Sequence, residues 1–188
     1  MNVIVEKPSQ SGKLTAKDWL KMAEFELSKS GISAVRVEPL AKKLKVTKGS
    51  FYWHFSSRKE LFEKLLTDWR IRSTNAIIER LNNANLTPKE RLKELFLLPQ
   101  KNLNHANGGA LELAIRNWSQ SDTTVKKTIK EIDTHRLAFI SDNFEALGYD
   151  KCQAELKASC FYYTMQGFKV VGIDQSNEHL EQIFEILL

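Results

Sequence analysis

The stretch EPLAKKLKVTKGSFYWHF, residues 38 to 55, constrains the fold of this chain more than any other segment. It contains two short helical patterns joined by a three-residue turn, Lys45 to Thr47, and it ends in polar aromatic residues. Pro39 suits the first turn of a helix, where its missing amide has no partner to lose, and Thr47 can cap the helix that follows. The spacing predicts a helix-turn-helix motif.

The second helix of this motif is predicted to expose aromatic and polar side chains that need a binding partner. Val46, Phe51 and Phe55 turn inward on a helical wheel. Exposed aromatic side chains are costly unless another molecule covers them. Gly49 costs a helix about 1 kcal/mol relative to alanine but lets another backbone approach closely. We infer that the partner is DNA. The outward or sideways positions are Lys48, Ser50, Tyr52, Trp53 and His54.

Helix-turn-helix geometry gives these side chains separate roles, because the second helix enters the major groove while the first crosses the phosphates. Lys48 can donate to guanine or phosphate, and Ser50 can reach a base edge. Tyr52 and His54 can bond to phosphates that flank the groove, and Trp53 can contact a sugar or a thymine methyl group.

The charge distribution supports this interpretation. Residues 1 to 68 carry 13 Lys and Arg against 8 Asp and Glu, an excess equal to the net charge of +5 of the whole chain. Such a basic excess is expected where phosphates are contacted. A solvated helix face explains the run equally well by itself, and the neighbouring aromatics favour DNA. Between residues 36 and 59, Glu38 opposes Arg36, Lys42, Lys43, Lys45, Lys48, Arg58 and Lys59.

The rest of the chain also has helical periodicity, without a competing strand pattern. Thr15 can cap a first helix that Gly31 ends, and the Ser57-x-x-Glu60 capping box opens a helix of about 25 residues. The expected fold is all-α, with about nine helices. The later helices are expected at 88–98, ended by Pro99, and at 109–120, 123–147, 151–171 and 177–188.

Composition sets the remaining bounds. The chain has 188 residues, 42% of them hydrophobic and 27% charged, as in a globular protein. It has no signal-like start and no apolar run of about 18 residues, so we expect a cytoplasmic protein with no membrane partner. Cys152 and Cys160 lie too far apart on one helix for a disulfide and are expected to be buried thiols. The four histidines lack metal-binding spacing, so we expect neither metal nor cofactor.

The run A-K-K-L-K-V-T-K-G-S-F-Y-W-H-F followed by S-S-R-K-E-L resembles the TetR family of bacterial transcriptional regulators. The resemblance covers roughly Leu14 to Leu66. It implies that the third helix contacts bases and phosphates and that Arg58, at the start of the fourth helix, grips the DNA backbone. The third-helix contacts implied are Lys48, Gly49, Ser50, Tyr52, Trp53 and His54, and we add the capping residue Thr47.

Two positions depart from the family pattern. Lys45 stands where the turn usually has glycine, and Arg36 stands where a Ser or Thr would cap the second helix. In a left-handed conformation Lys45 carries about 1 kcal/mol of strain, which a phosphate contact would compensate, although simple tolerance explains it as well. Without a capping hydroxyl, the first amides of the second helix are left to water or phosphate, which makes Arg36 a further contact candidate.

The chain is expected to divide into three parts. Residues 1–13 are largely polar, with Pro8 and Gly12, and are expected to form a flexible arm. The resemblance implies that residues 14–56 form a three-helix DNA-binding domain and that residues 57–188 form a larger helical domain for effector binding and dimerisation. A weaker likeness to the C-terminal domains of one TetR branch extends to A-I-R-N-W-S-Q-S-D and the F-E-A-L-G end.

The last helices carry the candidates for a dimer interface and a ligand pocket. Apolar stripes predict a dimer seam, although an intramolecular core explains them equally well. Aromatic and polar residue types, together with the cavity implied by the family, predict a ligand site, although plain core packing explains each residue alone. The dimer candidates are Ala158, Phe161, Met165, Leu180, Ile183, Phe184 and Leu187. The ligand candidates are Trp69, Arg116, Trp118, Tyr162 and Gln166.

We therefore predict a sequence-specific DNA-binding transcriptional regulator, a homodimeric repressor released from operator DNA by an unknown small-molecule effector. The alternative is a helical ligand-binding protein or enzyme with an incidental basic N-terminal end. The sequence has no nucleophile beside a base at fixed spacing and no glycine-rich phosphate loop. It also has no paired carboxylates in an apolar setting, so we expect no enzyme activity.

Overall fold

The computed structural model describes residues 14–101, 108–171 and 176–188, so the predicted arm at 1–13 lies outside the described residues. α4, η2 and α5 form one continuous helix, which leaves nine separate α-helices and no strand in these residues and confirms the all-α fold. None of these helices has the length and apolar character needed to span a bilayer. The elements are α1 (Ala16–Ser30), η1 (Ile32–Ala34), α2 (Val37–Leu44), α3 (Lys48–Tyr52), α4 (Arg58–Arg70), η2 (Ile71–Asn75), α5 (Ala76–Asn83), α6 (Pro88–Lys101), α7 (Gly108–Trp118), α8 (Thr123–Ala146), α9 (Lys151–Val171) and α10 (Asn177–Leu187).

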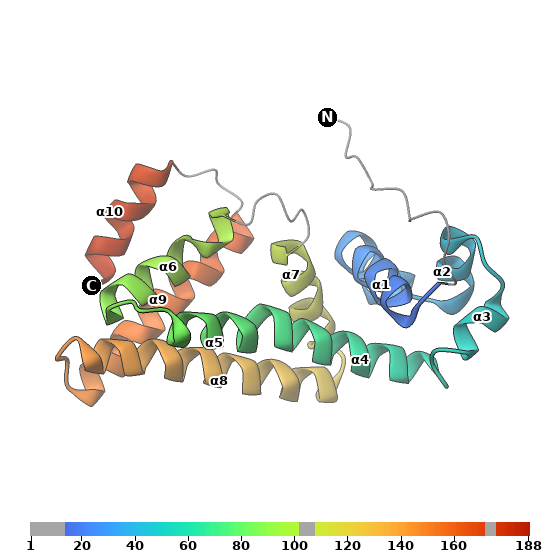
Figure 1. Cartoon of the computed structure of the whole chain (residues 1–188), viewed down its shortest axis with the longest axis horizontal. Coiled ribbons are helices and arrows are strands. Elements are labelled where there is room, and N and C mark those ends of the chain that lie inside the picture. The colour runs from blue at the N-terminus through green and yellow to red at the C-terminus, as the bar shows by residue number, and fades with distance from the viewer. Residues whose placement is uncertain (1–13, 102–107, 172–175) are drawn as a thin grey trace.

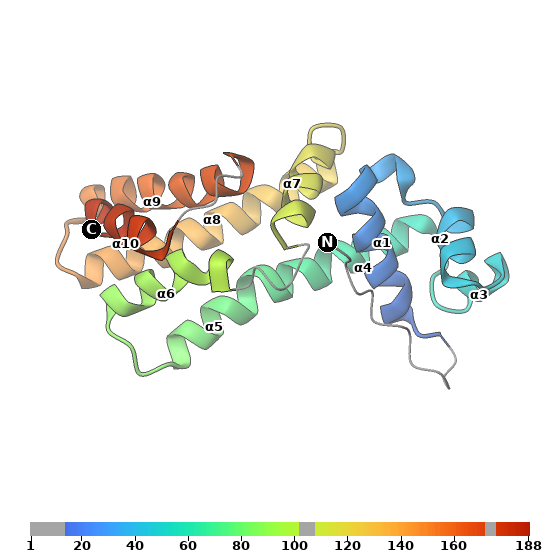
Figure 2. The same ribbon diagram turned by 90° about the horizontal axis from the view of Figure 1, so that it is seen from above.

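The continuous helix formed by α4, η2 and α5 runs along the molecule beside α8 (Figure 1). One end of it carries α1, α2 and α3, and the other end lies near α6, α9 and α10 (Figures 1 and 2). α7 lies between the two ends and packs against α1. The two short helices of the motif therefore lie at one extremity of an elongated chain.

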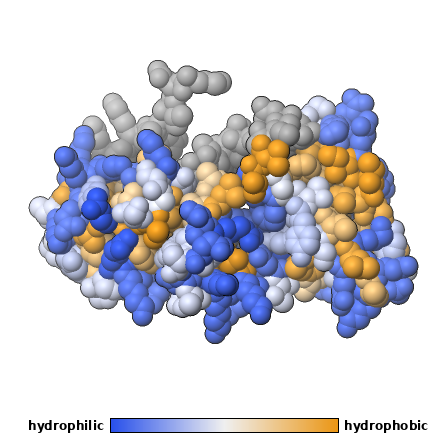
Figure 3. Space-filling view, turned by 180° about the vertical axis from the view of Figure 1, so that it is seen from behind, coloured by the Kyte–Doolittle hydropathy of each residue, from blue (hydrophilic) through white to orange (hydrophobic). Residues whose placement is uncertain are grey.

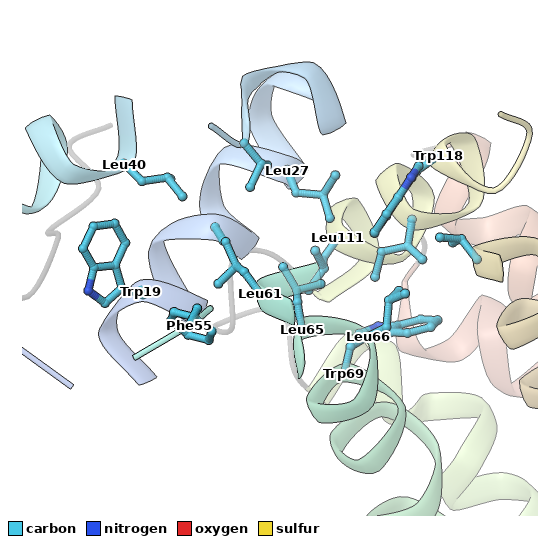
Figure 4. Packing of buried hydrophobic residues seen from close by; sticks show 14 of the residues in the cluster. Trp19, Leu27, Leu40, Phe55, Leu61, Leu65, Leu66, Trp69, Leu111 and Trp118 are labelled. Atoms are coloured by element: carbon cyan, nitrogen blue, oxygen red, sulfur yellow. The ribbon is translucent and has the colours of Figure 1, made fainter. Parts of the chain in front are cut away.

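The first hydrophobic cluster joins the N-terminal helices to the middle of the molecule. Trp19 of α1, Leu40 of α2 and Phe55 pack around Leu61 at the start of α4 (Figure 4). The same cluster continues to Leu111 and other residues of α7 and to the first turns of α8. The expected division between residues 56 and 57 lies within this shared cluster and stays a prediction.

The second cluster uses the residues that were expected to form a dimer seam. Phe161 of α9 and Phe184 of α10 are fully buried and pack with Phe96 of α6. Apolar periodicity shows that a helix face needs cover, but not which chain supplies the cover, and here the chain covers itself. Of the seven candidates, Ala158, Phe161, Met165, Leu180 and Phe184 are buried, and Ile183 and Leu187 are partly buried in the same cluster.

α2 begins at Val37, directly after its N-cap Arg36, so Pro39 lies in the first turn as expected. Two local expectations were wrong. α6 continues through Pro99 to Lys101, so the proline costs the helix one amide hydrogen bond near its end without stopping it. Cys152 and Cys160 are exposed, because α9 buries the opposite face. The predicted bounds of α9, 151–171, are confirmed.

Candidate nucleic-acid interface

The turn between α2 and α3 is closed around Lys45. Its amide donates to the carbonyl of Lys42 at 3.2 Å, and the amide of Val46 donates to the carbonyl of Ala41 at 3.0 Å. This pair of bonds ends a helix in a Schellman motif, which requires a left-handed residue. Lys45 has φ 58° and ψ 39°, the left-handed conformation considered from the sequence. Among the described residues it alone combines positive φ with a side chain.

α3 is anchored by one aromatic residue and presents others to solvent. Phe51 is fully buried, with its ring centroid 5.2 Å from that of Trp19 and 5.2 Å from that of Phe55. The opposite face leaves Tyr52 53% exposed and Trp53 77% exposed. The core contacts of Phe51 thus fix which face of α3 is turned to solvent.

Gly49 is not required by the packing of the chain itself. A Cβ atom at this position would meet the hydroxyl of Thr47 at 3.6 Å, which is an ordinary van der Waals distance. Alanine would also favour the helix by about 1 kcal/mol. The fold gives no reason for glycine here, whereas the close approach of another backbone does.

Lys48, at the start of α3, hydrogen-bonds to the carboxylate of Glu38 on α2. This bond raises the pKa of Lys48 and lowers the pKa of Glu38. Both side chains are exposed, so solvent screens the pair and it contributes little to stability. A phosphate can therefore replace Glu38 as the partner of Lys48 at little cost.

Arg58 has a structural role that the sequence did not indicate. Its Nε donates to the carbonyl of Val35 at 2.6 Å, and its Nη2 donates to the carbonyl of Ile32 at 3.0 Å. The guanidinium also lies over the ring of Phe62, 4.6 Å from the centroid. Burial, followed by the charge of Arg36, lowers the pKa of Arg58. Arg58 ties η1 to α4, and its grip on DNA stays a prediction.

The predicted DNA contacts are continuous along the turn and α3, apart from Arg36 and Arg58. Arg36 occupies the N-cap of α2 without a side-chain capping bond, as expected from its sequence. Whether these residues touch DNA stays a prediction. The exposed members are Arg36, Lys45, Thr47, Lys48, Gly49, Tyr52, Trp53 and Arg58, and the half-buried members are Ser50 and His54.

Several ligand candidates meet in a second site, a polar network centred on Glu112 of α7. Glu112 is 4% exposed. Its carboxylate accepts hydrogen bonds from Arg116 Nη2 at 2.9 Å, Arg136 Nη1 at 2.8 Å and Lys169 Nζ at 3.0 Å. Arg116 Nη2 also donates to Asp133 at 2.7 Å. We call Glu112, Arg116, Asp133, Arg136, Tyr162 and Lys169 the Glu112 network.

The remaining ligand candidates divide around this network. The hydroxyl of Tyr162 donates to Asp133 at 2.6 Å, and Gln166 accepts a bond from Lys169 at 3.2 Å. The guanidinium of Arg136 lies 5.8 Å from the ring centroid of Trp69. Trp118 instead packs edge-on against Phe62 in the first cluster, with 4.9 Å between centroids. The structure thus brings together four of the five candidates.

Burial and charge oppose each other within the network. Burial alone would raise the pKa of Glu112, but the charges of Arg136 and Lys169 outweigh it and hold that pKa far below its usual range. Burial also lowers the pKa of Lys169 and raises the pKa of Tyr162 to about 12.

Sequence reasoning missed four members of the network: Glu112, Asp133, Arg136 and Lys169. One signal was available, because Glu112 lies among apolar residues and precedes Arg116 by four positions, the spacing at which opposite charges meet on a helix. Asp133, Arg136 and Lys169 come from other helices, and the sequence offers no local sign that they converge.

Comparison with known proteins gives a match for the N-terminal part of the chain. Residues 20–65 match the family model described as bacterial regulatory proteins, tetR family. The HTH-type transcriptional regulator AcrR of Shigella flexneri is 29% identical over 72 residues, which are 38% of this chain and 32% of that protein. The aligned region therefore spans about a third of the relative's length.

Solved structures resemble the chain over nearly its whole length. A TetR transcriptional regulator from Legionella pneumophila has a TM-score of 0.73 and 19% identity, and the match covers 95% of this chain and 97% of that one. A TetR-like transcriptional regulator from Rhodococcus sp. RHA1 has a TM-score of 0.75 and 16% identity, with coverage of 95% and 96%. At these identities the likeness establishes the fold.

Proposed function

We propose that this chain, which belongs to the tetR family of bacterial regulatory proteins, is a sequence-specific DNA-binding transcriptional regulator. The observation that carries the proposal is the geometry of α3, where buried Phe51 holds Tyr52 and Trp53 out in solvent beside Lys48. The enzyme alternative gains no support, since the matched family and relative are described as regulators.

In the proposed complex α3 enters the major groove and α2 crosses the phosphates. Gly49 lets the helix approach the DNA backbone, and Lys48 exchanges Glu38 for a phosphate or a guanine. We retain residues 14–56 as the proposed DNA-binding domain and 57–188 as the proposed effector and dimerisation domain.

A homodimer is supported by an apolar stripe on the outer face of α9. Its first four members are spaced three or four residues apart and the last follows after seven, as on one side of a helix. Hydrophobic residues gather at the end of the molecule that carries α9 and α10 (Figure 3). A two-fold pair would present two α3 helices to half-sites about 34–36 Å apart, or a multiple of that. The stripe consists of Cys152, Leu156, Cys160, Tyr163 and Val170, all exposed, and we call it the α9 stripe.

A charge placed within the α9 stripe tests this seam. Leu156 is 64% exposed, so the fold of one chain tolerates Leu156→Asp, but a dimer interface would not. We expect the variant to be monomeric by light scattering at concentrations where the wild type is dimeric. Lys126→Asp, at an exposed position of α8, is the control and should leave the mass unchanged. A wild-type monomer would overturn the proposed dimer.

We further propose that the chain is a repressor and that its effector binds at the Glu112 network. Trp69, Arg116, Tyr162 and Gln166 supply aromatic and polar groups near one another, as small-molecule sites require. Trp118 is the least supported member, because it packs with Phe62 in the first cluster.

The full chain can be tested without knowledge of its operator. Repeated selection from a library of random duplexes should enrich one sequence, or a two-fold symmetric pair of half-sites. Fluorescence anisotropy at moderate salt should then show tighter binding to the selected duplex than to random duplex, by a factor of about a thousand or more. Failure to enrich any sequence would overturn the proposed function.

A further inference from the structure

The continuous helix that links the two ends of the molecule contains a π-helical turn, η2, at Ile71–Asn75. Ala76 donates its amide hydrogen to the carbonyl of Ile71, five residues back rather than four. A π-turn holds one residue more than an α-helical turn, and such turns are often found at functional sites. Because each α-helical residue adds a rotation of about 100°, a change in this turn reorients α4 relative to α5.

The N-terminal half of η2 is bound to the DNA-binding end. Arg72 donates from Nη2 to the carboxylate of Glu24 on α1, and from Nε to Asp68 on α4 at 2.7 Å. The side chain of Glu24 is only 16% exposed. Burial raises the pKa of Glu24, and the charge of Arg72 opposes that effect. Arg72 thus fixes the angle of the turn relative to α1.

The next two residues of η2 are bound to the opposite side of the molecule. Arg136 of α8 donates from Nε to the hydroxyl of Thr74 at 2.9 Å, and from Nη2 to the carbonyl of Ser73 at 3.2 Å. Its Nη1 donates to Glu112. Arg136 therefore connects η2 directly to the Glu112 network, where we place the effector.

The turn itself has an unmet polar group. The side-chain oxygen of Asn75 is buried and has no hydrogen-bond partner among the described residues. A buried acceptor without a donor is unfavourable, and a π-turn is intrinsically less favourable than an α-helical one. The contacts of Arg72 and Arg136 counter both costs, so changes in those contacts alter the balance between this turn and another geometry.

We propose that η2 is a conformational switch held by two contacts, Arg72 with Glu24 and Arg136 with Ser73 and Thr74, through which the Glu112 network controls the position of the DNA-binding end. The inference rests on the proposed regulatory function. With both contacts in place, α3 is held at a fixed position relative to the rest of the chain. Loss of either contact frees the turn, and an operator must then order a mobile domain, which weakens binding.

Two variants cut the contacts separately. Thr74→Val keeps the volume of a buried side chain but removes the oxygen that accepts from Arg136. Arg72→Gln removes the charge that meets Glu24. The matched controls lie on the same continuous helix: Thr67→Val removes a hydroxyl that bonds only within α4, to Glu63, and Arg80→Gln removes an exposed charge on α5.

Affinity for the selected duplex gives the first readout. Each cutting variant should weaken that affinity about five-fold or more, while binding to random duplex stays as in the wild type. The double variant should bind the selected duplex almost as tightly as the single variant that has the lower affinity, because the loss of either contact already frees the same turn. Affinities of the single variants close to wild type, or losses that multiply in the double variant, would overturn the switch.

Hydrogen exchange without DNA gives a second readout that does not depend on the proposed function. Thr74→Val should speed amide exchange in η2 and also in α1 around Glu24, although Thr74 touches the far side of the turn. Thr67→Val should leave both regions unchanged. Faster exchange confined to η2 shows that the two contacts are not coupled. If the wild type selects no duplex, the proposed function fails, and exchange alone decides whether η2 couples the two ends.

Discussion

The DNA-binding end and the Glu112 network place their charges in opposite ways. Around α3 the interior is aromatic and aliphatic, while Lys45 and Lys48 stand in solvent. In the network Glu112 and Arg136 lie inside the protein and satisfy each other. Charges of the first kind are available to DNA, whereas charges of the second kind also hold helices together. Substitutions at the first should therefore change DNA binding with little effect on stability, and substitutions of the buried charges at the second should lower stability in addition to any effect on the proposed effector.

The largest effect is expected from Glu112→Gln. The change leaves Arg116, Arg136 and Lys169 facing a neutral amide in a buried site, and breaking a buried charge pair typically costs about 3–5 kcal/mol. Chemical denaturation should show this loss at neutral pH. Glu131→Gln is the control, because its pairing with Arg70 at 3.7 Å is half exposed and screened. Equal losses of unfolding free energy in the two variants would mean that the buried charges of the network contribute no more to stability than exposed ones.

The same carboxylate predicts how stability depends on pH. The pKa of Glu112 is lowered in the folded chain, so the folded state holds the proton less tightly than the unfolded state does. Its contribution to stability is complete above the unfolded pKa of about 4.3 and is lost as the pH falls toward the folded pKa. The difference in unfolding free energy between wild type and Glu112→Gln should therefore shrink below about pH 5. A difference that stays constant down to pH 3 would contradict the lowered pKa.

The DNA-binding end was largely predictable because its signals are local. The start of α3 after Thr47, the stop at Gly31 and the alternation of Phe51 with Tyr52 each depend on residues a few positions apart. The predicted capping bond from the Thr47 hydroxyl is not formed, although Thr47 occupies the N-cap position. Periodicity gave the helices to within a few residues. Even there, the two backbone bonds of Arg58 to η1 escaped prediction, because they join residues 23 and 26 positions apart.

The Glu112 network could not be predicted because its members, like Arg58 and η1, are joined across long stretches of sequence. Arg136 reaches Glu112 across 24 positions and Thr74 across 62, and no pattern within one helix indicates such distances. The buried face of α9 was identified as apolar, but its partner was left open, since periodicity cannot distinguish a neighbouring helix from a second copy. The π-turn likewise depends on contacts from α1 and α8.

At the DNA-binding end, Tyr52→Ala should affect binding and leave the fold intact. The ring is 53% exposed and packs edge-on against Phe51, with 5.2 Å between centroids, so its loss should lower the free energy of unfolding by only about 1 kcal/mol. Affinity for the selected duplex should fall by about 1–3 kcal/mol. Tyr52→Phe separates the hydroxyl from the ring and should lose most of that affinity if the hydroxyl bonds to phosphate. A large loss of stability with unchanged DNA affinity would mean that Tyr52 stabilises the fold and does not contact DNA.

The smallest effect, and the finest test of the comparison, is expected at Lys45, where fold and binding make opposite demands. Glycine at this left-handed position relieves about 1 kcal/mol of strain, but the greater conformational freedom of glycine in the unfolded chain lowers stability by about 0.5–1 kcal/mol. Lys45→Gly should therefore stabilise the protein by less than about 1 kcal/mol in chemical denaturation. If the lysine contacts phosphate, the same variant should bind all duplexes more weakly and lower the slope of log affinity against log salt by about 1. Lys45→Ala keeps the strain and loses the charge, so it should reproduce the binding loss without the gain in stability. If the salt dependence of DNA affinity is unchanged in both variants, the chain merely tolerates the lysine. A charge that is exposed beside α3 would then not be sufficient to indicate a DNA contact.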